Sequence, residues 1–411
     1  MKILNVIIFG FLVIVSALII LINLKLYSGS NISEDKREDI LLQLNFLEAE
    51  LKTNDLGNRM QVIFPEGFVF SNVLYGLSWC EYGMSDTSES NKVRALNEAL
   101  YAFNQINSEN ALSVFDPNMI PANGIFYLGW NNYLLSKILQ LNSNFDGSEK
   151  LRSQFQFQCE LIASSLLNSK TPFLQSYQNQ SWPADMCAAM ASVSLDNKSF
   201  NPKYGNLIAE WVKEVRSKTD PVTKLIPHEV NSTTGETLEG ARGSSISLII
   251  RLLSEIDRNF AREQFELYQQ YFVSTTFGLP SINEYPKGQT GSGDIDSGPV
   301  IFGVGFAGTI VSIGTFSSLG HNEQADCQYK TINAFGLSYK TSQFKKYLFG
   351  ELPIADAFIV WGRSTGLNSN DSEKLNSGFW RIKFQLISFS LIILMWSLYY
   401  SKSIIRKLTT K

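Results

Sequence analysis

Two kinds of apolar pattern alternate along the middle of the chain and predict two kinds of helix. Some stretches are apolar on every face and rich in aromatic residues, which is typical of helices buried on all sides. Others place apolar residues three or four positions apart, as at Val93, Leu96, Leu100 and Phe103, which predicts helices with one wet face. Buried helices are expected within 64–83, 125–135, 186–195, 242–254 and 300–316. Amphipathic helices are expected at 89–106, 149–167, 201–218 and 257–272, with a last pair at 322–335 and 340–348.

The order of these segments predicts a ring of helical hairpins. Each buried helix follows a loop rich in Gly, Pro, Trp and acidic residues, and the pattern repeats roughly every fifty to sixty residues, in five or six pairs. In a closed ring the inner helices touch protein on all sides, whereas the outer helices keep a face in water. A small β-hairpin is expected at 225–235. An irregular α-helical bundle is the alternative architecture.

Both ends of the chain are apolar enough to cross a membrane. Residues 3–24 are almost wholly apolar and uncharged, which suits a spanning helix. A second run at 384–400 reaches about 20 residues when 380–401 is counted, and aromatic residues flank it as at a membrane interface. A cleaved signal peptide and a buried C-terminal helix are the respective alternatives.

The charges predict which side of the membrane each part occupies. The two ends carry eight Lys and Arg residues and no acids; since the whole chain carries -3, the middle carries -11. Basic ends favour the cytoplasm, so both termini are expected inside and the large domain outside. A third span at 300–316 would put the basic tail outside, so we interpret that run as an inner helix.

These observations divide the chain into six parts. We predict a transmembrane anchor at 1–26, a juxtamembrane helix at 27–55, the helical ring at 56–350, a linker at 351–379, a transmembrane helix at 380–401 and a basic cytoplasmic tail at 402–411. An acidic outer domain makes nucleic acid an unsuitable partner. The expected partners are the lipid bilayer and a glycan or small-molecule ligand.

Cysteine and histidine are too sparse for a standard metal site. The chain has four cysteines and two histidines, without CxxC spacing: Cys80, Cys159, Cys187, Cys327, His228 and His321. This excludes a standard zinc module and a histidine-rich metal site, and we expect no metal or cofactor. The cysteines could form one or two disulfides, or remain four buried free thiols.

Acidic residues gather at the entrances of the apolar helices. Three carboxylates and an aromatic ring lie within fourteen residues before the run at 300–316: Glu284, Tyr285, Asp294 and Asp296. Such acids are costly to bury unless they are paired or used. Asp185 and Arg242 occupy similar places at two other entrances, so we expect these loops to converge on one rim.

Seven short motifs in order give a resemblance to known proteins. They are Phe64-Pro65-Glu66-Gly67, Leu74-Tyr75-Gly76-Leu77, Tyr127-Leu128-Gly129-Trp130, Trp182-Pro183-Ala184-Asp185, Leu225-Ile226-Pro227-His228, Arg242-Gly243-Ser244-Ser245 and Asp294-Ile295-Asp296-Ser297-Gly298-Pro299. Over residues 56–350 the chain resembles (α/α)6-toroid proteins, in particular linalool dehydratase-isomerase-like domains and, more loosely, six-hairpin glycosidases. The resemblance implies an all-α, (α/α)6 toroid with short β-hairpins and a central cavity at the N-terminal ends of the inner helices.

The first functional hypothesis is a glycan hydrolase or lyase. Glycoside cleavage needs one protonated and one ionised carboxyl group, roughly 5–9.5 Å apart. We expect Asp185 to be the base or nucleophile and Glu284 or Asp294 the acid, with Asp296 in the same pool. The expected substrate contacts are aromatic rings for stacking, a guanidinium for an acidic sugar and the histidine of the fifth motif: Trp130, Trp182, Tyr285, Arg242 and His228.

The same residues also have structural explanations. Asp185 and Asp296 stand where a helix N-cap belongs, and Arg242 could pair with Asp294 or Asp296 to join two loops. A second hypothesis is therefore a non-enzymatic membrane protein that binds a ligand or acts as a scaffold. A third is a dehydratase-isomerase for an apolar alcohol, which requires Cys80 and Cys187 to meet in one apolar pocket.

Overall fold

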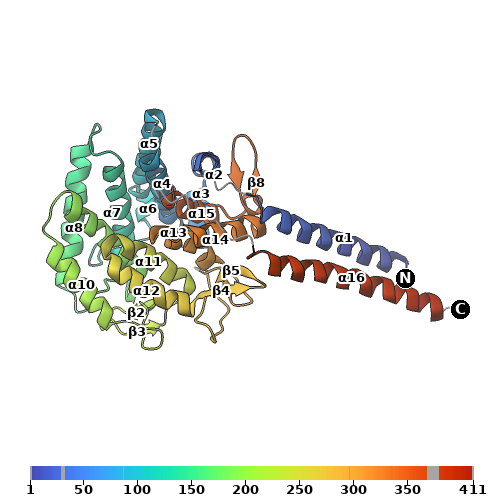
Figure 1. The fold of residues 1–411 in the computed structure, drawn as a ribbon. Helices are drawn as coiled ribbons and strands as arrows, with labels where there is room; N and C mark the ends of the chain where they lie inside the picture. Colours follow the sequence, from blue (N-terminus) through green and yellow to red (C-terminus); the bar gives the residue numbers. More distant parts are fainter. Residues whose placement is uncertain (1, 29–32, 87, 296, 368–378, 410–411) are drawn as a thin grey trace.

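The molecule consists of a rounded helical body and a pair of helices that project from it (Figure 1). The computed structural model describes residues 2–28, 33–86, 88–295, 297–367 and 379–409. Nearly all regular structure in these residues is α-helical, and the strands form small antiparallel sheets at the ends of helices. The all-α prediction with short β-hairpins is therefore confirmed.

An inner ring of helices forms the centre of the body. Within the described residues its members are α4 (Gly67–Ser85), α7 (Gly124–Leu141), α9 (Pro183–Ser199), α11 (Gly243–Ile256), α13 (Phe306–Ser318) and α15 (Pro353–Thr365). Each of them packs against the next, and α15 packs against α4, so the ring is closed. Most residues of α4, α7 and α9 are buried, as the all-round apolar pattern predicts.

A second layer of helices surrounds this ring. Its members are α2 (Ser33–Lys52), α5 (Glu89–Ile106), α8 (Ser148–Leu167), α10 (Gly205–Ser217), α12 (Arg258–Tyr271) and α14 (Asn322–Phe335). They pack respectively on α15, α4, α7, α9, α11 and α13. Their inner faces carry the predicted apolar stripes; in α10 the buried residues are Trp211, Val212 and Val215. Short helices α3 (Leu56–Ile63) and α6 (Glu109–Leu112) lie in the connections.

The predicted limits of the ring need correction. Residues 351–379 were expected to be a linker, but Pro353–Thr365 is the inner helix α15, with Ile359, Val360 and Trp361 almost fully buried. The predicted juxtamembrane helix exists as α2, but it is the outer partner of α15. The ring therefore runs from residue 33 to residue 365 rather than from 56 to 350, because its last inner helix pairs with its first outer helix.

Small β-sheets complete the body. They contain β1 (Gln180–Ser181), β2 (Glu229–Asn231) and β3 (Thr237–Glu239); β4 (Val273–Thr276) and β5 (Leu279–Ile282); β6 (Val300–Ile301) and β7 (Val304–Gly305); and β8 (Tyr339–Lys340) and β9 (Lys345–Lys346). The helix predicted at 340–348 is wrong: Thr341 turns the chain there, and β9 buries Lys345 against Asp39. The run predicted as one helix at 300–316 begins with the β6–β7 hairpin and becomes helical at Phe306.

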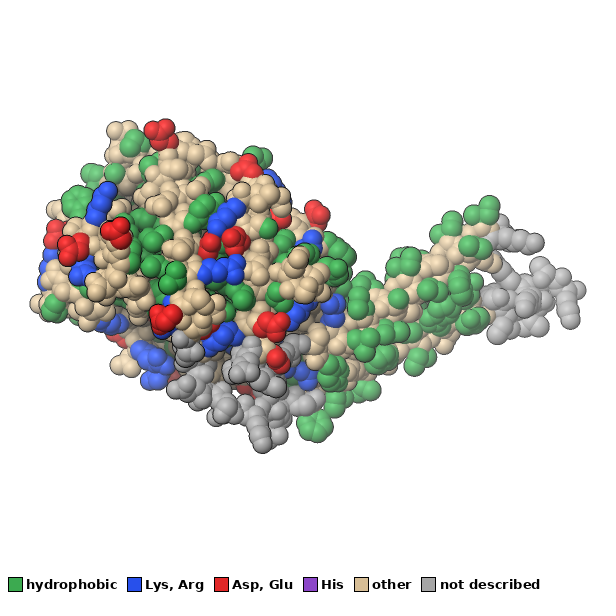
Figure 2. Space-filling view, turned by 90° about the horizontal axis from the view of Figure 1, so that it is seen from above, with side chains coloured by type: hydrophobic (Ala, Val, Ile, Leu, Met, Phe, Trp, Pro, Cys, Tyr) green, Lys and Arg blue, Asp and Glu red, His purple; other side chains and the backbone are tan. Residues whose placement is uncertain are grey.

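The projecting pair consists of α1 (Lys2–Lys25) and α16 (Ile382–Thr409), which lie side by side (Figure 1). Asn23 donates to the Ser388 hydroxyl over 3.0 Å, and Trp396 donates to the Ser16 hydroxyl over 3.0 Å. Figure 2 shows hydrophobic side chains over the visible face of this pair, whereas charged side chains are scattered over the body. Segments Ile3–Lys25 and Ile382–Ser401 are long and apolar enough to cross a membrane, as predicted.

Candidate functional site

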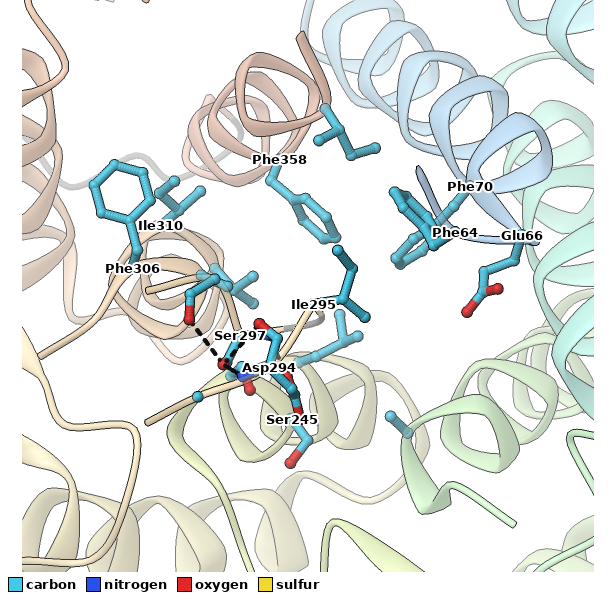
Figure 3. Close-up of a pocket in the computed structure, with 18 of the residues that line it drawn as sticks. Phe64, Glu66, Phe70, Ser245, Asp294, Ile295, Ser297, Phe306, Ile310 and Phe358 are labelled. Atoms are coloured by element: carbon cyan, nitrogen blue, oxygen red, sulfur yellow. Dashed lines mark hydrogen bonds between the residues drawn. The ribbon is translucent and has the colours of Figure 1, made fainter. Parts of the chain in front are cut away.

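A cavity of about 640 Å³ lies at the N-terminal ends of the inner helices. Each inner helix, or the loop that leads into it, supplies part of the lining, and the loop residues 292–295 and 297–299 supply another wall. Most of the lining is aliphatic or aromatic, including Phe64, Phe70, Phe126, Phe306 and Phe358. Figure 3 shows several of these rings around the space, with Ile295 reaching into it from the loop. The cavity lies where the toroid resemblance placed it.

Among the described residues, three carboxylates and one imidazole interrupt this apolar lining: Glu66, Asp185, Asp294 and His228. Each comes from a different entrance loop or first turn, so the fold brings together groups that are far apart in the sequence. Serine hydroxyls from the start of α11, at Ser244 and Ser245, add hydrogen-bonding groups. A largely apolar pocket with a few convergent polar groups is the usual form of a small-molecule site.

Asp185 lies in the first turn of α9 and is held by two donors. Its Oδ1 accepts from the Trp130 indole nitrogen over 3.0 Å, and its Oδ2 accepts from the Ser176 hydroxyl over 2.7 Å. Gly129 permits this arrangement, because a Cβ atom there would lie only 3.0 Å from the Asp185 backbone oxygen. Trp182, and not Asp185, occupies the N-cap position. The N-cap interpretation of Asp185 is therefore wrong.

Trp130 does not reach the cavity. Its side chain is fully buried and is absent from the lining, so its indole supports Asp185 from behind. The predicted stacking of Trp130 on a sugar is thus corrected to a positioning role. Trp182, by contrast, is half-buried and lines the cavity, in edge contact with Tyr177 at a ring separation of 5.5 Å.

Arg242 ties together the loops around the cavity without lining it. Its Nε donates to Glu284 over 2.9 Å, and its guanidinium also donates to Asp294 and lies 3.5 Å from Glu239. The ring of Tyr285 packs beside the guanidinium at 5.5 Å. These contacts agree with the structural interpretation of Arg242, and neither Arg242 nor Tyr285 reaches the cavity lining.

Neither predicted acid is placed to donate a proton to a ligand. Glu284 is completely buried, accepts from Arg242 and Ser244, and does not line the cavity. Asp294 does line the cavity. Partial burial alone would raise its pKa, but hydrogen bonds from Arg242 and Ser297 outweigh burial and lower the pKa to about 2. Asp294 is therefore ionised at neutral pH. Asp296 lies outside the described residues.

His228 is a buried, neutral imidazole at the cavity wall. Burial, and then the nearby charge of Arg242, lower its pKa to about 4. Its side chain is 7% exposed, and its Nδ1 atom has no hydrogen-bond partner among the described residues. A buried polar atom of this kind is costly unless a ligand or water satisfies it, which makes His228 a candidate ligand contact.

Glu66 is a cavity carboxylate that the sequence analysis did not select. It precedes α4, makes no side-chain N-cap hydrogen bond, and is half-buried in the lining. Figure 3 shows Glu66 on the α4 side of the space and Asp294 on the loop side. The signal that could have found it is its position in the first motif, at a helix entrance equivalent to that of Asp185.

The cysteine chemistry of the third hypothesis has no support in this geometry. All four cysteines are buried and free, and neither Cys80 nor Cys187 lines the cavity. Burial raises the pKa of both thiols, which opposes formation of a reactive thiolate. Within the described part of the chain no cluster of three metal-ligating side chains occurs.

Comparison with known proteins defines the class of fold. No protein-family model and no curated protein sequence matches the chain. A solved structure of an unsaturated glucuronyl hydrolase specific for heparin is similar over 80% of this chain and 96% of its own, with a TM-score of 0.50 and 9% identity. A D-mannose isomerase aligns over 72% of this chain and 86% of its own, with a TM-score of 0.44 and 12% identity. The first likeness supports the looser resemblance, to six-hairpin glycosidases, at the level of fold.

Proposed function

We propose that the protein is a membrane-anchored toroid that binds a carbohydrate in the central cavity and processes it by acid/base catalysis. Glu66 is the proton donor, and Asp185 is the base or nucleophile. The observation that carries the proposal is the convergence of all six inner-helix entrances on one cavity that mixes aromatic rings with carboxylates. Asp294 is ionised and supplies negative charge beside the reacting bond.

The assignment of roles follows from the contacts of each carboxylate. Both oxygens of Asp185 accept hydrogen bonds, which is the behaviour of an ionised carboxylate and suits a base or nucleophile. Asp294 has too low a pKa to act as an acid at neutral pH. Among the carboxyl groups of the described cavity lining, Glu66 is therefore the one that we assign to protonating a leaving group.

The lining also suits a sugar ring. Trp182 and the phenylalanines offer faces against which the apolar side of a sugar can pack, and His228 and Ser245 offer hydrogen bonds to hydroxyl groups. One fold hosts many reactions, so the structural neighbour does not fix the substrate. Its description as a heparin-specific unsaturated glucuronyl hydrolase makes acidic and unsaturated oligosaccharides the first ligands to test.

We further propose that α1 and α16 span a membrane, with the toroid outside the cytoplasm and both termini inside. Both helices leave the body in the same direction, and their segments Ile3–Lys25 and Ile382–Ser401 are mostly uncovered by protein. The basic residues at the two ends of the sequence support this orientation.

The test is a glycan screen on the purified full chain in detergent, with binding and turnover measured together. We expect Glu66→Gln and Asp185→Asn to retain binding and to lose turnover by about 100-fold or more, the range of a lost general acid or base. Glu149→Gln, which changes an exposed carboxylate on α8, is the matched control. Turnover unaffected by either cavity substitution would rule out the assigned roles.

A second candidate function is ligand binding without catalysis. The largely apolar lining favours it, because such a cavity also accepts an amphipathic molecule. In that case the screen detects binding without product formation, and the Glu66→Gln substitution leaves the affinity unchanged.

A further inference from the structure

Two β-hairpins near the projecting helices carry phenylalanine at turn positions that disfavour it. The β4–β5 turn is Phe277-Gly278 and the β6–β7 turn is Phe302-Gly303. Their φ angles are 52° and 90° in the first turn, and 53° and 81° in the second. Two-residue turns with both φ values positive prefer Asn-Gly or Asp-Gly, because a bulky residue is strained there. The chain has phenylalanine at this position in both hairpins.

These two rings are also exposed. Phe277 is 48% exposed and Phe302 is 76% exposed, and their only close ring partner among the described aromatic residues is each other, edge to face at 5.2 Å. Neither turn preference nor contact with water favours phenylalanine at these tips. Backbone strain combined with exposed apolar area at two adjacent tips points to an apolar partner.

The tips lie where α16 leaves the body. A Cβ atom on Gly278 would lie 2.7 Å from Cβ of Lys383, so the first turn touches the beginning of α16. Leu279, just after that turn, is buried with Leu26 at the end of α1, and Phe384 packs against this cluster. The two hairpin tips are thus level with the body-side ends of both apolar helices.

Further exposed aromatic residues occur at the same level. Phe335, at the end of α14, is 44% exposed and contacts the ring of Phe384 at 5.9 Å. Phe379, just before α16, is 81% exposed. We name Phe277, Phe302, Phe335 and Phe379 the aromatic collar. Basic side chains lie beside it at Lys383 and Arg381, and Arg381 donates to the backbone oxygen of Leu26 over 3.0 Å.

We propose that the aromatic collar enters the lipid bilayer around α1 and α16, so that the toroid rests on the membrane through its two hairpin tips. This inference rests on the proposed membrane anchoring and is independent of the proposed chemistry. Aromatic rings with adjacent Lys and Arg are typical of the boundary between acyl chains and headgroups. The strain at Phe277 and Phe302 is then offset by transfer of their rings from water to lipid.

The collar also connects the membrane to the candidate site. The cavity wall at 292–295 and 297–299 leads into β6, and the turn after β6 carries Phe302. This wall is therefore held at one end by the ion pair between Arg242 and Asp294 and at the other by the bilayer.

The test places an environment-sensitive fluorophore on single introduced cysteines of the full chain in phospholipid nanodiscs. All four native cysteines are buried, so a maleimide reagent labels the introduced one. The test variants are Phe277→Cys and Phe302→Cys. Phe157→Cys is the matched control, since Phe157 is 60% exposed on α8, away from the projecting pair (Figure 1). Ile14→Cys, within α1, reports membrane anchoring itself.

We expect nitroxide-labelled lipids to quench the labels at 277 and 302 several-fold more than the label at 157, and aqueous iodide to do the reverse. The collar is overturned if labels at 277 and 302 behave like that at 157 while the label at 14 is quenched by lipid. If lipid quenches neither 14 nor 302, the anchoring fails and the collar fails with it. No glycan is used, so failure of the carbohydrate proposal does not affect the outcome.

A second measurement tests whether Phe277 and Phe302 serve membrane insertion rather than the stability of the fold. Phe277→Asn and Phe302→Asn introduce the residue that these turns prefer, so we expect them to keep or raise the thermal stability of the chain in detergent. The same variants should bring a label at the other tip into reach of iodide in nanodiscs. Unchanged lipid quenching of that label would contradict insertion of the pair as a unit.

Discussion

At the scale of single residues, Arg242 connects loops around the cavity although it does not line the cavity. It is 2% exposed and joins Glu284, which is completely buried, to Asp294 on the cavity wall. A buried ion pair contributes little net stability, but removing one partner leaves an uncompensated charge. The role expected for Arg242 from the sequence, holding an acidic sugar, is replaced by that of fixing the wall.

We predict that Arg242→Ala lowers the free energy of unfolding by about 3–5 kcal/mol, because Glu284 loses its partner while it stays buried. The measurement is chemical denaturation in detergent. Arg216→Ala is the control: Arg216 pairs with Glu263 on the surface, where both side chains are exposed, and the expected loss is at most about 1 kcal/mol. Equal losses in the two variants would show that the buried cluster does not hold the loops.

His228 predicts a pH dependence of stability. Its folded pKa of about 4 lies below the ordinary value of 6.5 because the ring is buried and faces Arg242. Between these values the unfolded chain binds more protons, so the free energy of unfolding falls as the pH falls, by about 3 kcal/mol in total. His228→Gln should remove this part of the slope, and the contribution of His321, whose pKa burial also lowers, should remain. An unchanged slope in His228→Gln would contradict the assignment.

At the scale of elements, the ring closes by pairing the two ends of the folded body. The first outer helix, α2, packs on the last inner helix, α15, and Gln43 of α2 donates to the backbone oxygen of Asp356 over 3.2 Å. Asp39 of α2 lies 2.8 Å from Arg363 of α15. Loss of either α2 or α15 therefore leaves the ring without one complete pair of inner and outer helices.

We therefore predict that a fragment of residues 33–367 folds, whereas a fragment of residues 56–350 does not. The shorter fragment lacks α2 and α15 and exposes the apolar faces of α4 and α13, against which α15 packs. Circular dichroism and cooperative thermal unfolding distinguish the two. A cooperative transition in the 56–350 fragment would restore the shorter domain limits.

The sequence predicted the fold better than it predicted the site. Apolar periodicity located most inner and outer helices, because burial on one face or on all faces leaves a local pattern. It missed α15, which was assigned to a linker, and it assigned a helix to the β8–β9 hairpin, whose Lys345 is paired with the distant Asp39.

Contacts between residues far apart in the sequence determine which of the selected side chains face the cavity. Asp185, Trp182, His228 and Asp294 each belong to an entrance motif, and all four line the cavity. Trp130 in the third motif and Glu284 before the run at 300–316 were also selected, but their side chains turn toward Asp185 and Arg242 respectively. Nothing local in the sequence distinguishes a carboxylate that faces the cavity from one that faces an arginine.

At the scale of the whole molecule, the toroid brings the cavity, the ion-pair cluster and the projecting helices α1 and α16 into one connected structure. The described residues 297–305 lead from the cavity wall to a hairpin tip near the beginning of α16. In our proposal, ligand binding, loop position and contact with the bilayer are connected through this segment. The proposed function depends first on whether the cavity receives the ligand.

The most direct test of that claim fills the cavity. Ser245 is buried in the first turn of α11 and lines the space, so Ser245→Trp places a large side chain inside it. Ser153→Trp, at an exposed position on α8, is the control. Calorimetric titration with an oligosaccharide from the screen should show binding to the wild type and to Ser153→Trp, and none to Ser245→Trp. Equal affinity in all three proteins would contradict the cavity as the binding site.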